Sequence, residues 1–259
     1  MIIYKTPAEI EIMRQGGQKL AIILKKLGSL VKPGLSAETL ELAAHQEITK
    51  TGAKAAFLNY QTGFLGKYPA ALCVSVNEEV VHGLPAKNKI FQKGDLVGLD
   101  CGIWYGGLCV DAAITVGCGE ISPEAQKLIN VTREALRIGI SRCRLGNCIG
   151  DIGEAIQKYV EAQNFSVIRS LVGHGVGRQV HEDPSVPNFF PIDETRPKNR
   201  GAKIKDGMTL AIEPMVAAGS ARVKRGRDGY AAATQDKSWS AHFEHTVAVT
   251  KTGTLILTQ

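Results

Sequence analysis

The sequence has no long apolar segment and no dense cysteine framework. Nothing in it approaches the roughly 20 apolar residues of a membrane-spanning helix, and the first residues, MIIYKTPAEIEIMRQGG, lack a basic region followed by an uninterrupted apolar stretch. The 6 cysteines form no CxxC pair, and a chain of 259 residues buries enough apolar surface to fold without disulfides. We therefore expect reduced thiols, a cytoplasmic location and no membrane association.

A surplus of acidic residues is also absent. The formal net charge is +6, which favours polyanionic partners and points to an RNA-rich neighbourhood. Because the chain has no nucleic-acid-binding motif, the alternative is a rim of solvated loop charges. The charge therefore bears on location more than on chemistry. The basic residues are densest at Lys198, Arg200, Lys203 and Lys205, and again at Arg222, Lys224, Arg225 and Arg227.

Helix signals occur in two pairs. Thr6-Pro7-Ala8-Glu9 combines a capping residue, a proline at the first helical position and a glutamate at the third, which predicts a helix to about Leu30. Apolar residues at helical spacing predict a second helix over residues 37–51. The same order returns with a helix from Ser122 to about Ile138 and another within residues 146–165.

Predicted strands follow each helix pair. Apolar runs predict strands at 71–76, 96–104 and 108–116 in the first half of the chain, and at 208–214 and 242–250 in the second half. The fold class is then α+β, with strands of both halves in one curved antiparallel sheet and the helices on its outer face.

The two halves also align with each other. The segment GDLVGLD, which ends at Asp100, matches GMTLAIE, which ends at Glu213, and VKPGLSAETLELAAHQEI matches CRLGNCIGDIGEAIQKYV at nearly the same offset. These matches predict a pseudo-twofold duplication within a single domain, residues 1–259, with repeats of approximately 1–120 and 121–259. Asp100 and Glu213 are expected to face each other across the internal axis.

Two aspartates are expected on one face of a hairpin. Tyr105-Gly106-Gly107 is a turn signal between two strands, and a turn centred on the two glycines places residue 102 opposite residue 111. Side chains two residues apart share a face, so Asp100 and Asp111 become diagonal neighbours. Two ionised aspartates among apolar residues repel each other and are costly to desolvate, and a cation would relieve both effects.

Two further acids lie within predicted strands. Glu213 ends the apolar run 208–212, and Glu244 lies between Phe243 and the apolar run 246–249. For a single acid, the alternative is a turn cap or a surface charge, but acids are rarely buried unless paired or bound to metal. Four such acids with one histidine form the oxygen-rich donor set typical of two divalent ions that share carboxylates.

The stretch GHGVGR places His174 between glycines. The glycine spacing resembles a dinucleotide-binding loop only superficially, because the next residues, RQVHEDP, do not begin a helix. Glycines let the backbone approach a neighbour closely, which fits a metal-bound histidine at a sheet edge with a substrate strand beside it.

The other histidines differ in position. His45 falls on a polar helix face and His245 points away from Glu244 by strand parity, so neither is assigned a role. His242 shares the face of Glu244, and the sequence leaves open whether it reaches the site. Two loop histidines are candidates either for function or for polar filling, namely His82 and His181.

Five segments match a known family. In order they are NEEVVHG, LDCGIWYGGLCVD, GHGVGRQVHEDP, AIEPM and HFEHT. Over nearly its whole length the chain resembles the methionine aminopeptidases, and it is similar to the type I class because the segment between His181 and Glu213 is short. The resemblance implies the pita-bread fold, a single catalytic domain and a dinuclear metal centre. The ligands would be Asp100, Asp111, His174, Glu213 and Glu244, with Asp111 and Glu244 bridging.

The resemblance also implies a reaction. The enzyme would remove the N-terminal methionine of nascent polypeptides with a water activated by two divalent ions, which could be Fe(II), Mn(II), Co(II) or Zn(II). Glu213 would be the general base, His181 would donate to the developing oxyanion, and His82 would lie near the amide nitrogen of the leaving residue.

A methionine pocket is also implied. Tyr68, Cys73 and Tyr230 fall at positions similar to the lining of that pocket in the family. Tyr230 replaces a common tryptophan, and Leu65 and Val180 stand where aromatic residues are more usual, which leaves the size of the pocket open. The loop 185–201 is longer than the bacterial norm and is assigned no role.

Two other functions share parts of this pattern. A proline-specific aminopeptidase or dipeptidase has the same fold and ligand set, but usually carries an extra N-terminal domain that 259 residues cannot hold. A non-catalytic binding module would be expected to lose ligands, and all of them are present. For partners, we expect nascent polypeptide N-termini and docking at the ribosome surface through the basic loops, with a monomeric protein.

Overall fold

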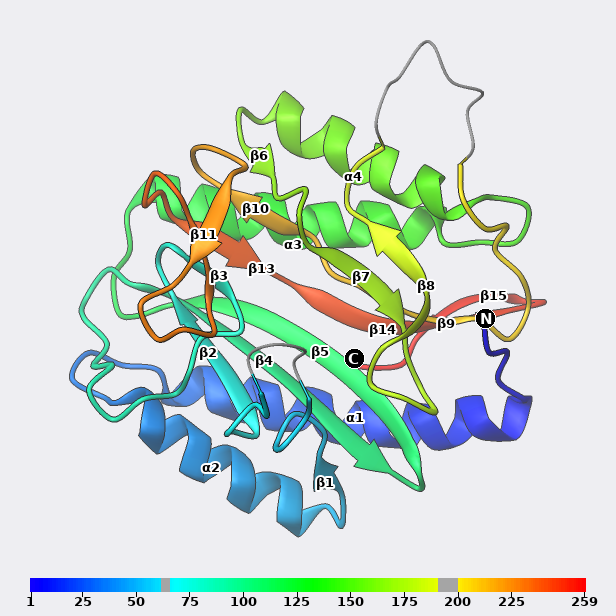
Figure 1. The fold of residues 1–259 in the computed structure, drawn as a ribbon, viewed down its shortest axis with the longest axis horizontal. Helices are drawn as coiled ribbons and strands as arrows, with labels where there is room; N and C mark the ends of the chain where they lie inside the picture. The colour runs from blue at the N-terminus through cyan, green and yellow to red at the C-terminus, as the bar shows by residue number, and fades with distance from the viewer. Residues whose placement is uncertain (62–65, 191–199) are drawn as a thin grey trace.

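The computed structural model describes residues 1–61, 66–190 and 200–259. Its helices form two pairs, as predicted, with one pair beside each half of a curved sheet (Figure 1). Thr6 and Glu9 form the predicted capping box, and Ser36 and Ser122 cap the next two helices of the chain. The helices are α1 (Pro7–Leu30), α2 (Ala37–Lys50), α3 (Pro123–Arg142), which extends past its predicted end, and α4 (Ile149–Ala162).

The central sheet is antiparallel and curved, which confirms the predicted α+β class. Its strand order is β1-β4-β5-β14-β9-β7-β8, with β2 beside β4 and β15 beside β14. Strands from the two halves of the chain meet where β5 pairs with β14. The strands are β1 (Lys54–Ala55), β2 (Leu72–Val76), β4 (Leu96–Tyr105), β5 (Leu108–Gly117), β7 (Val172–Gly175), β8 (Glu182–Pro187), β9 (Thr209–Ile212), β14 (Glu244–Thr250) and β15 (Gly253–Ile256).

Two small sheets flank the central one. One has the order β13-β10-β6 and the other has the order β11-β12-β3. Most of their strands are too short to produce a period in the sequence, and only the start of the predicted strand 242–250 touches them. Their bounds are β3 (Glu79–Val81), β6 (Ser166–Val167), β10 (Met215–Ala217), β11 (Val223–Arg225), β12 (Ala232–Thr234) and β13 (Ser240–His242).

The hairpin of β4 and β5 has the predicted register. Gly102 pairs with Asp111 and Asp100 pairs with Ala113, so Asp100 and Asp111 are diagonal neighbours on one face. The tight turn forms because Gly106 and Gly107 both have positive φ, at 57° and 82°, as a two-residue type I′ hairpin turn requires.

Two apolar clusters hold the helices against the sheet. One includes Leu20 of α1 and Leu99 of β4, and the other includes Leu128 of α3 and Leu210 of β9. Each buried leucine contributes about 1.5–3 kcal/mol relative to an exposed one. A β-carbon on Gly17 would lie 2.1 Å from the carbonyl oxygen of Leu257, so only glycine lets α1 lie this close to the C-terminal segment.

The long loop after His181 is shorter than predicted. Residues 185–187 belong to β8, which pairs with β7. The two prolines of β8 obscured it in the sequence, because proline is tolerated on an edge strand but weakens a strand signal. The centre of the loop, 191–199, and Leu65 lie outside the described residues.

The cysteines form no disulfide bonds. All of them are free thiols, as predicted. In the part of the chain that the structure describes, no helix has the length and apolar character needed to cross a membrane.

Candidate metal centre

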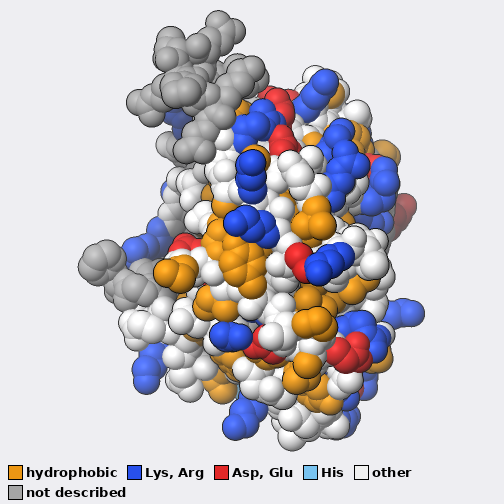
Figure 2. All heavy atoms as spheres, turned by 90° about the vertical axis from the view of Figure 1, so that its right-hand side faces the viewer, with side chains coloured by type: hydrophobic (Ala, Val, Ile, Leu, Met, Phe, Trp, Pro, Cys, Tyr) orange, Lys and Arg blue, Asp and Glu red, His pale blue; other side chains and the backbone are white. Residues whose placement is uncertain are grey.

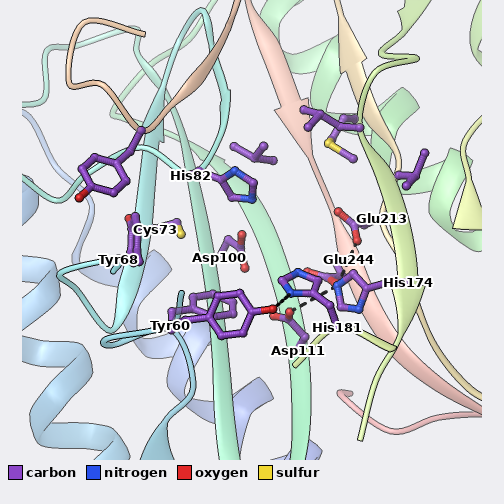
Figure 3. A pocket seen from close by; sticks show the side chains of 16 residues that line it. Tyr60, Tyr68, Cys73, His82, Asp100, Asp111, His174, His181, Glu213 and Glu244 are labelled. Atoms are coloured by element: carbon purple, nitrogen blue, oxygen red, sulfur yellow. Dashed lines mark hydrogen bonds and ion pairs between the residues drawn. The ribbon is translucent and has the colours of Figure 1, made fainter. Parts of the chain in front are cut away.

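Five neighbouring strands each bring one candidate ligand to the same cavity. The strands are consecutive in the sheet, in the order β4, β5, β14, β9 and β7. The cavity has a volume of about 330 Å³, and Figure 3 shows the carboxylates and the imidazole pointing into it. The side chains are Asp100, Asp111, Glu244, Glu213, which directly follows β9, and His174.

Strand register places the carboxylates side by side. Ala113 of β5 pairs with Asp100 on one side and with Glu244 on the other, so these three residues form one row across the sheet. Asp111 lies two residues before Ala113 and shares its face. The small side chain of Ala113 leaves the space between the two acids of the row open.

The glycines of the GHGVGR stretch have a packing role. His174 pairs with Ala211 of β9, and β7 is held between β9 and β8. A β-carbon on Gly173 would lie 2.3 Å from the carbonyl oxygen of Ala211, and one on Gly175 would lie 2.2 Å from that of Asp183. Close approach of three backbones therefore fixes the position of His174, in agreement with the predicted role of the glycines. The predicted place at a sheet edge is wrong, because β8 pairs with β7 and takes the edge position.

A hydrogen bond determines which nitrogen of His174 faces the acids. Its Nδ1 lies 2.8 Å from the carbonyl oxygen of Gly175, which can only accept, so Nδ1 carries the hydrogen. The lone pair of Nε2 is thus free, 3.5 Å from Glu213 Oε1 and 4.0 Å from Asp111 Oδ2. Burial lowers the pKa of His174 to about 4, so the imidazole is neutral and able to bind a metal.

The acids are buried together at high electrostatic cost. Burial raises the pKa of Asp111 to about 7. Burial, followed by repulsion from Asp111, raises the pKa values of Asp100, Glu213 and Glu244 well above their ordinary range. Metal-free protein therefore retains protons among these carboxylates near neutral pH.

A divalent cation fits this arrangement. Asp100 Oδ1, Asp111 Oδ1 and Glu244 Oε1 are buried and have no hydrogen-bond partner among the described residues. Donor atoms of Asp111, His174 and Glu244 all lie within 4.8 Å of one another. Unpaired carboxylate oxygens beside a neutral imidazole are the donors that divalent transition metals prefer, so the residues suit a metal centre.

His181 and His82 line the same cavity from two loops. The Nδ1 of His181 lies 2.7 Å from the hydroxyl oxygen of Tyr60, and the rings of His181 and His174 are 4.2 Å apart (Figure 3). Tyr60 was missed in the sequence, where nothing connects it to a histidine so distant along the chain. His82 has a positive φ of 62°, a rare conformation for a residue other than glycine.

The residues predicted to line a methionine pocket lie together on one side of the cavity. Tyr68, Cys73 and Tyr230 all line it, and Cys73 pairs with Asp100 in the sheet. The rings of Tyr68 and Tyr230 meet edge to face with centroids 5.6 Å apart. The Tyr68 hydroxyl donates to the carbonyl oxygen of Gly83 at 2.9 Å, which ties this wall to the loop that carries His82.

His45 and His245 lie away from the cavity, as the sequence predicts. His45 pairs with Glu41 on α2 at 2.9 Å, and His245 lies 2.9 Å from the hydroxyl of Thr258, so neither faces the cavity. His242, left open by the sequence, is buried with its Nε2 3.8 Å from Glu213 Oε2. His242 therefore lies next to the candidate ligand Glu213, on the side away from the cavity.

Known proteins are similar to this chain in sequence and in fold. The family model for metallopeptidase family M24 matches residues 11–251. The methionine aminopeptidase of Clostridium perfringens is 47% identical over 258 residues, which cover 100% of this chain and 99% of the relative. The crystal structure of the methionine aminopeptidase of Thermotoga maritima has a TM-score of 0.91 at 44% identity, with 100% of each chain covered. The pita-bread fold is thereby confirmed.

A proline-specific relative is more distant. The Xaa-Pro dipeptidase of Bacillus anthracis has a TM-score of 0.76 at 21% identity, and the match covers 99% of this chain but only 62% of the dipeptidase. This likeness shows the fold alone, and the alternative of a proline-specific enzyme is not favoured. The chain therefore belongs to metallopeptidase family M24, and within it to the methionine aminopeptidases.

Proposed function

We propose that the protein removes the N-terminal methionine from polypeptides by metal-dependent hydrolysis. The observation that carries the proposal is the convergence of three buried acids, the partly buried Glu213 and one neutral imidazole from five neighbouring strands, beside an apolar pocket. The apolar pocket would receive the side chain, and the acids would hold the metals that act on the adjoining peptide bond.

The proposed ligands are the residues already expected from the sequence. Asp111 and Glu244 belong to β5 and β14, the strands at which the two halves of the chain meet, and are the proposed bridging residues, with Asp100, His174 and Glu213 completing the set. When bound, two divalent ions supply an activated water near neutral pH and polarise the scissile carbonyl. The donor set suits Fe(II), Mn(II), Co(II) or Zn(II), and metal availability would decide among them.

The chain itself supplies proton transfer and hydrogen bonds. Glu213 is the proposed general base, which takes a proton from the attacking water and returns it to the leaving amine. His181 is the proposed donor to the oxyanion. If the Tyr60 hydroxyl donates to Nδ1, the hydrogen of the neutral ring is on Nε2, which is then available to donate. His82 is proposed to contact the amide of the leaving residue.

The apolar wall gives the proposed specificity. Tyr68 and Cys73 are each only 4% exposed, so their side of the pocket that they line with Tyr230 is shielded from solvent. A shielded, polarisable pocket suits a thioether. A second cavity of about 510 Å³ shares Val172, His174 and His181 with the first and would receive the residues that follow the methionine.

We further propose one catalytic domain over residues 1–259, built from the two repeats, that acts as a monomer in the cytoplasm. The pairing of α1 with α2 and of α3 with α4, each pair over its own apolar cluster, supports the repeat.

Peptide hydrolysis tests the proposed function. Metal-loaded protein is expected to release methionine from Met-Ala-Ser and to leave Xaa-Pro peptides intact, and a chelator should abolish the release, which re-addition of Mn(II) restores. Turnover of Xaa-Pro peptides in place of Met-Ala-Ser would contradict the assignment, and turnover that persists in chelator would contradict the metal dependence.

A second proposal concerns docking at the ribosome surface. On the face that Figure 2 shows, basic side chains are interspersed with acidic and apolar ones and form no continuous block. The proposal therefore rests on the segment 222–227 around β11, where Arg222, Lys224, Arg225 and Arg227 are exposed and have no acidic partner among the described residues. Lys198 of the other basic segment lies outside the described residues.

Charge reversal tests this docking. Replacing Lys224 and Arg225 with glutamate is expected to reduce salt-sensitive co-sedimentation with ribosomes, because phosphate contacts by basic side chains dominate such binding. Hydrolysis of Met-Ala-Ser by the free enzyme should be unchanged. Co-sedimentation equal to that of the unaltered protein would refute the docking site.

A further inference from the structure

His242 lies behind Glu213 and is not among the residues that line the metal-centre cavity. Its side chain is 4% exposed, and its Nε2 is buried with no hydrogen-bond partner among the described residues. A buried polar atom without a partner costs about 1–3 kcal/mol. The Nε2 lies 3.8 Å from Glu213 Oε2, slightly beyond hydrogen-bond distance.

The backbone of His242 is held in the same way as that of a proposed ligand. The Thr115 hydroxyl accepts from the backbone nitrogen of His242 at 2.9 Å and donates to its carbonyl oxygen at 2.8 Å. The Thr246 hydroxyl makes the same two bonds to Asp111, at 2.9 and 2.8 Å. His242 is therefore placed as firmly as Asp111.

The two threonine hydroxyls, each with its pair of backbone hydrogen bonds, are related by strand pairing. Ala113 and Glu244 pair where β5 meets β14, and Asp111 and His242 each precede a member of this pair by two residues. His242 ends β13, and one residue separates it from the start of β14, so His242 and Asp111 lie at opposite ends of the contact between β5 and β14. Asp111 lines the cavity. His242 does not line it, because the side chain of Glu213 lies between His242 and the cavity.

We propose that His242 is a positioning residue for Glu213, and that its Nε2–H donates to the Glu213 carboxylate when the metal centre is occupied. The inference rests on the proposed function, in which Glu213 is both a ligand and the general base. The donation requires the separation of 3.8 Å to shorten to about 3 Å. A donor fixed behind a metal-binding carboxylate orients its lone pairs, and loss of such a donor typically weakens metal binding or activity by about 10- to 100-fold.

A matched pair of variants tests the donor. His242→Met and His242→Gln introduce unbranched side chains of similar length, but only glutamine retains an N–H. We expect His242→Met to weaken Mn(II) binding, measured by calorimetry on metal-free protein, and to lower kcat, each by about 10- to 100-fold, with KM unchanged. His242→Gln should stay within about threefold of the unaltered protein. Unaltered affinity and kcat in His242→Met, or equal losses in both variants, would overturn the proposal.

A control and a direct measurement complete the test. His245→Gln alters a half-buried histidine that bonds Thr258 instead of the site, and its Mn(II) affinity should not change. Nitrogen NMR of the unaltered protein loaded with Zn(II) reports on His242 without any substitution. A proton on Nε2 is expected, and an unprotonated Nε2 would overturn the proposal even if His242→Met fails to fold. If the unaltered protein shows no metal-dependent hydrolysis, the proposed function fails; if it does and His242→Met behaves normally, only this inference fails.

Discussion

Replacing Asp111 with asparagine is expected to lower kcat/KM on Met-Ala-Ser by more than about a thousandfold, which corresponds to about 4 kcal/mol of transition-state stabilisation. Asp111 is a proposed bridging ligand from β5, and its donor atoms cluster with those of His174 and Glu244. An uncharged amide is a poor bridge between two cations, so calorimetry should show that at least one Mn(II) site is lost.

The same substitution is expected to spare the metal-free fold. Burial raises the pKa of Asp111 from 3.8 to about 7, so the folded state binds the proton more tightly than the unfolded chain does. The stability of metal-free protein therefore falls as the pH rises through this window, and at pH about 8 the buried charge is destabilising. Asp111→Asn removes that charge, and its unfolding temperature at pH about 8 should equal or exceed that of the metal-free parent. A lower unfolding temperature would assign the activity loss to misfolding.

Replacing His181 with alanine is expected to lower kcat by about 100-fold, or about 3 kcal/mol, while metal content stays unchanged. His181 lines the cavity and is oriented by the Tyr60 hydroxyl at 2.7 Å, but it belongs to no cluster of metal-donor atoms among the described residues. A donor to the oxyanion acts mainly in the transition state, so kcat should fall more than KM rises.

Substitution of a histidine outside the cavity provides the control for this result. His45 pairs with Glu41 on α2 and is not among the residues that line the cavity, so His45→Ala should leave both kcat and metal content unaltered. Loss of metal from His181→Ala, measured by elemental analysis, would contradict the role as an unligated donor and make His181 a metal ligand.

The parts of the site that follow from local rules could be predicted. A two-residue glycine turn and the alternation of a strand suffice to place Asp100 and Asp111 on one face, and the structure has that register. Acids inside apolar runs indicated a metal before any fold was known. Parity likewise separated His245 from Glu244.

The parts that depend on tertiary packing could not. Tyr60 meets His181 only because a loop after β1 folds over the β7 to β8 connection. Thr246 clamps Asp111 only because β5 and β14 pair in one particular register. His242 remained open because parity fixes the face of a side chain but not how far it reaches, and Glu213 intervenes between it and the cavity.

We propose that side chains from five neighbouring strands hold the two metal ions on which hydrolysis depends. Anaerobic titration of metal-free protein with Mn(II), with bound metal and methionine release followed in the same samples, tests it most directly. We predict that binding saturates at about two ions per chain, that release rises with occupancy, and that His174→Ala loses both. Full binding and release in His174→Ala, or release without bound metal, would contradict the claim.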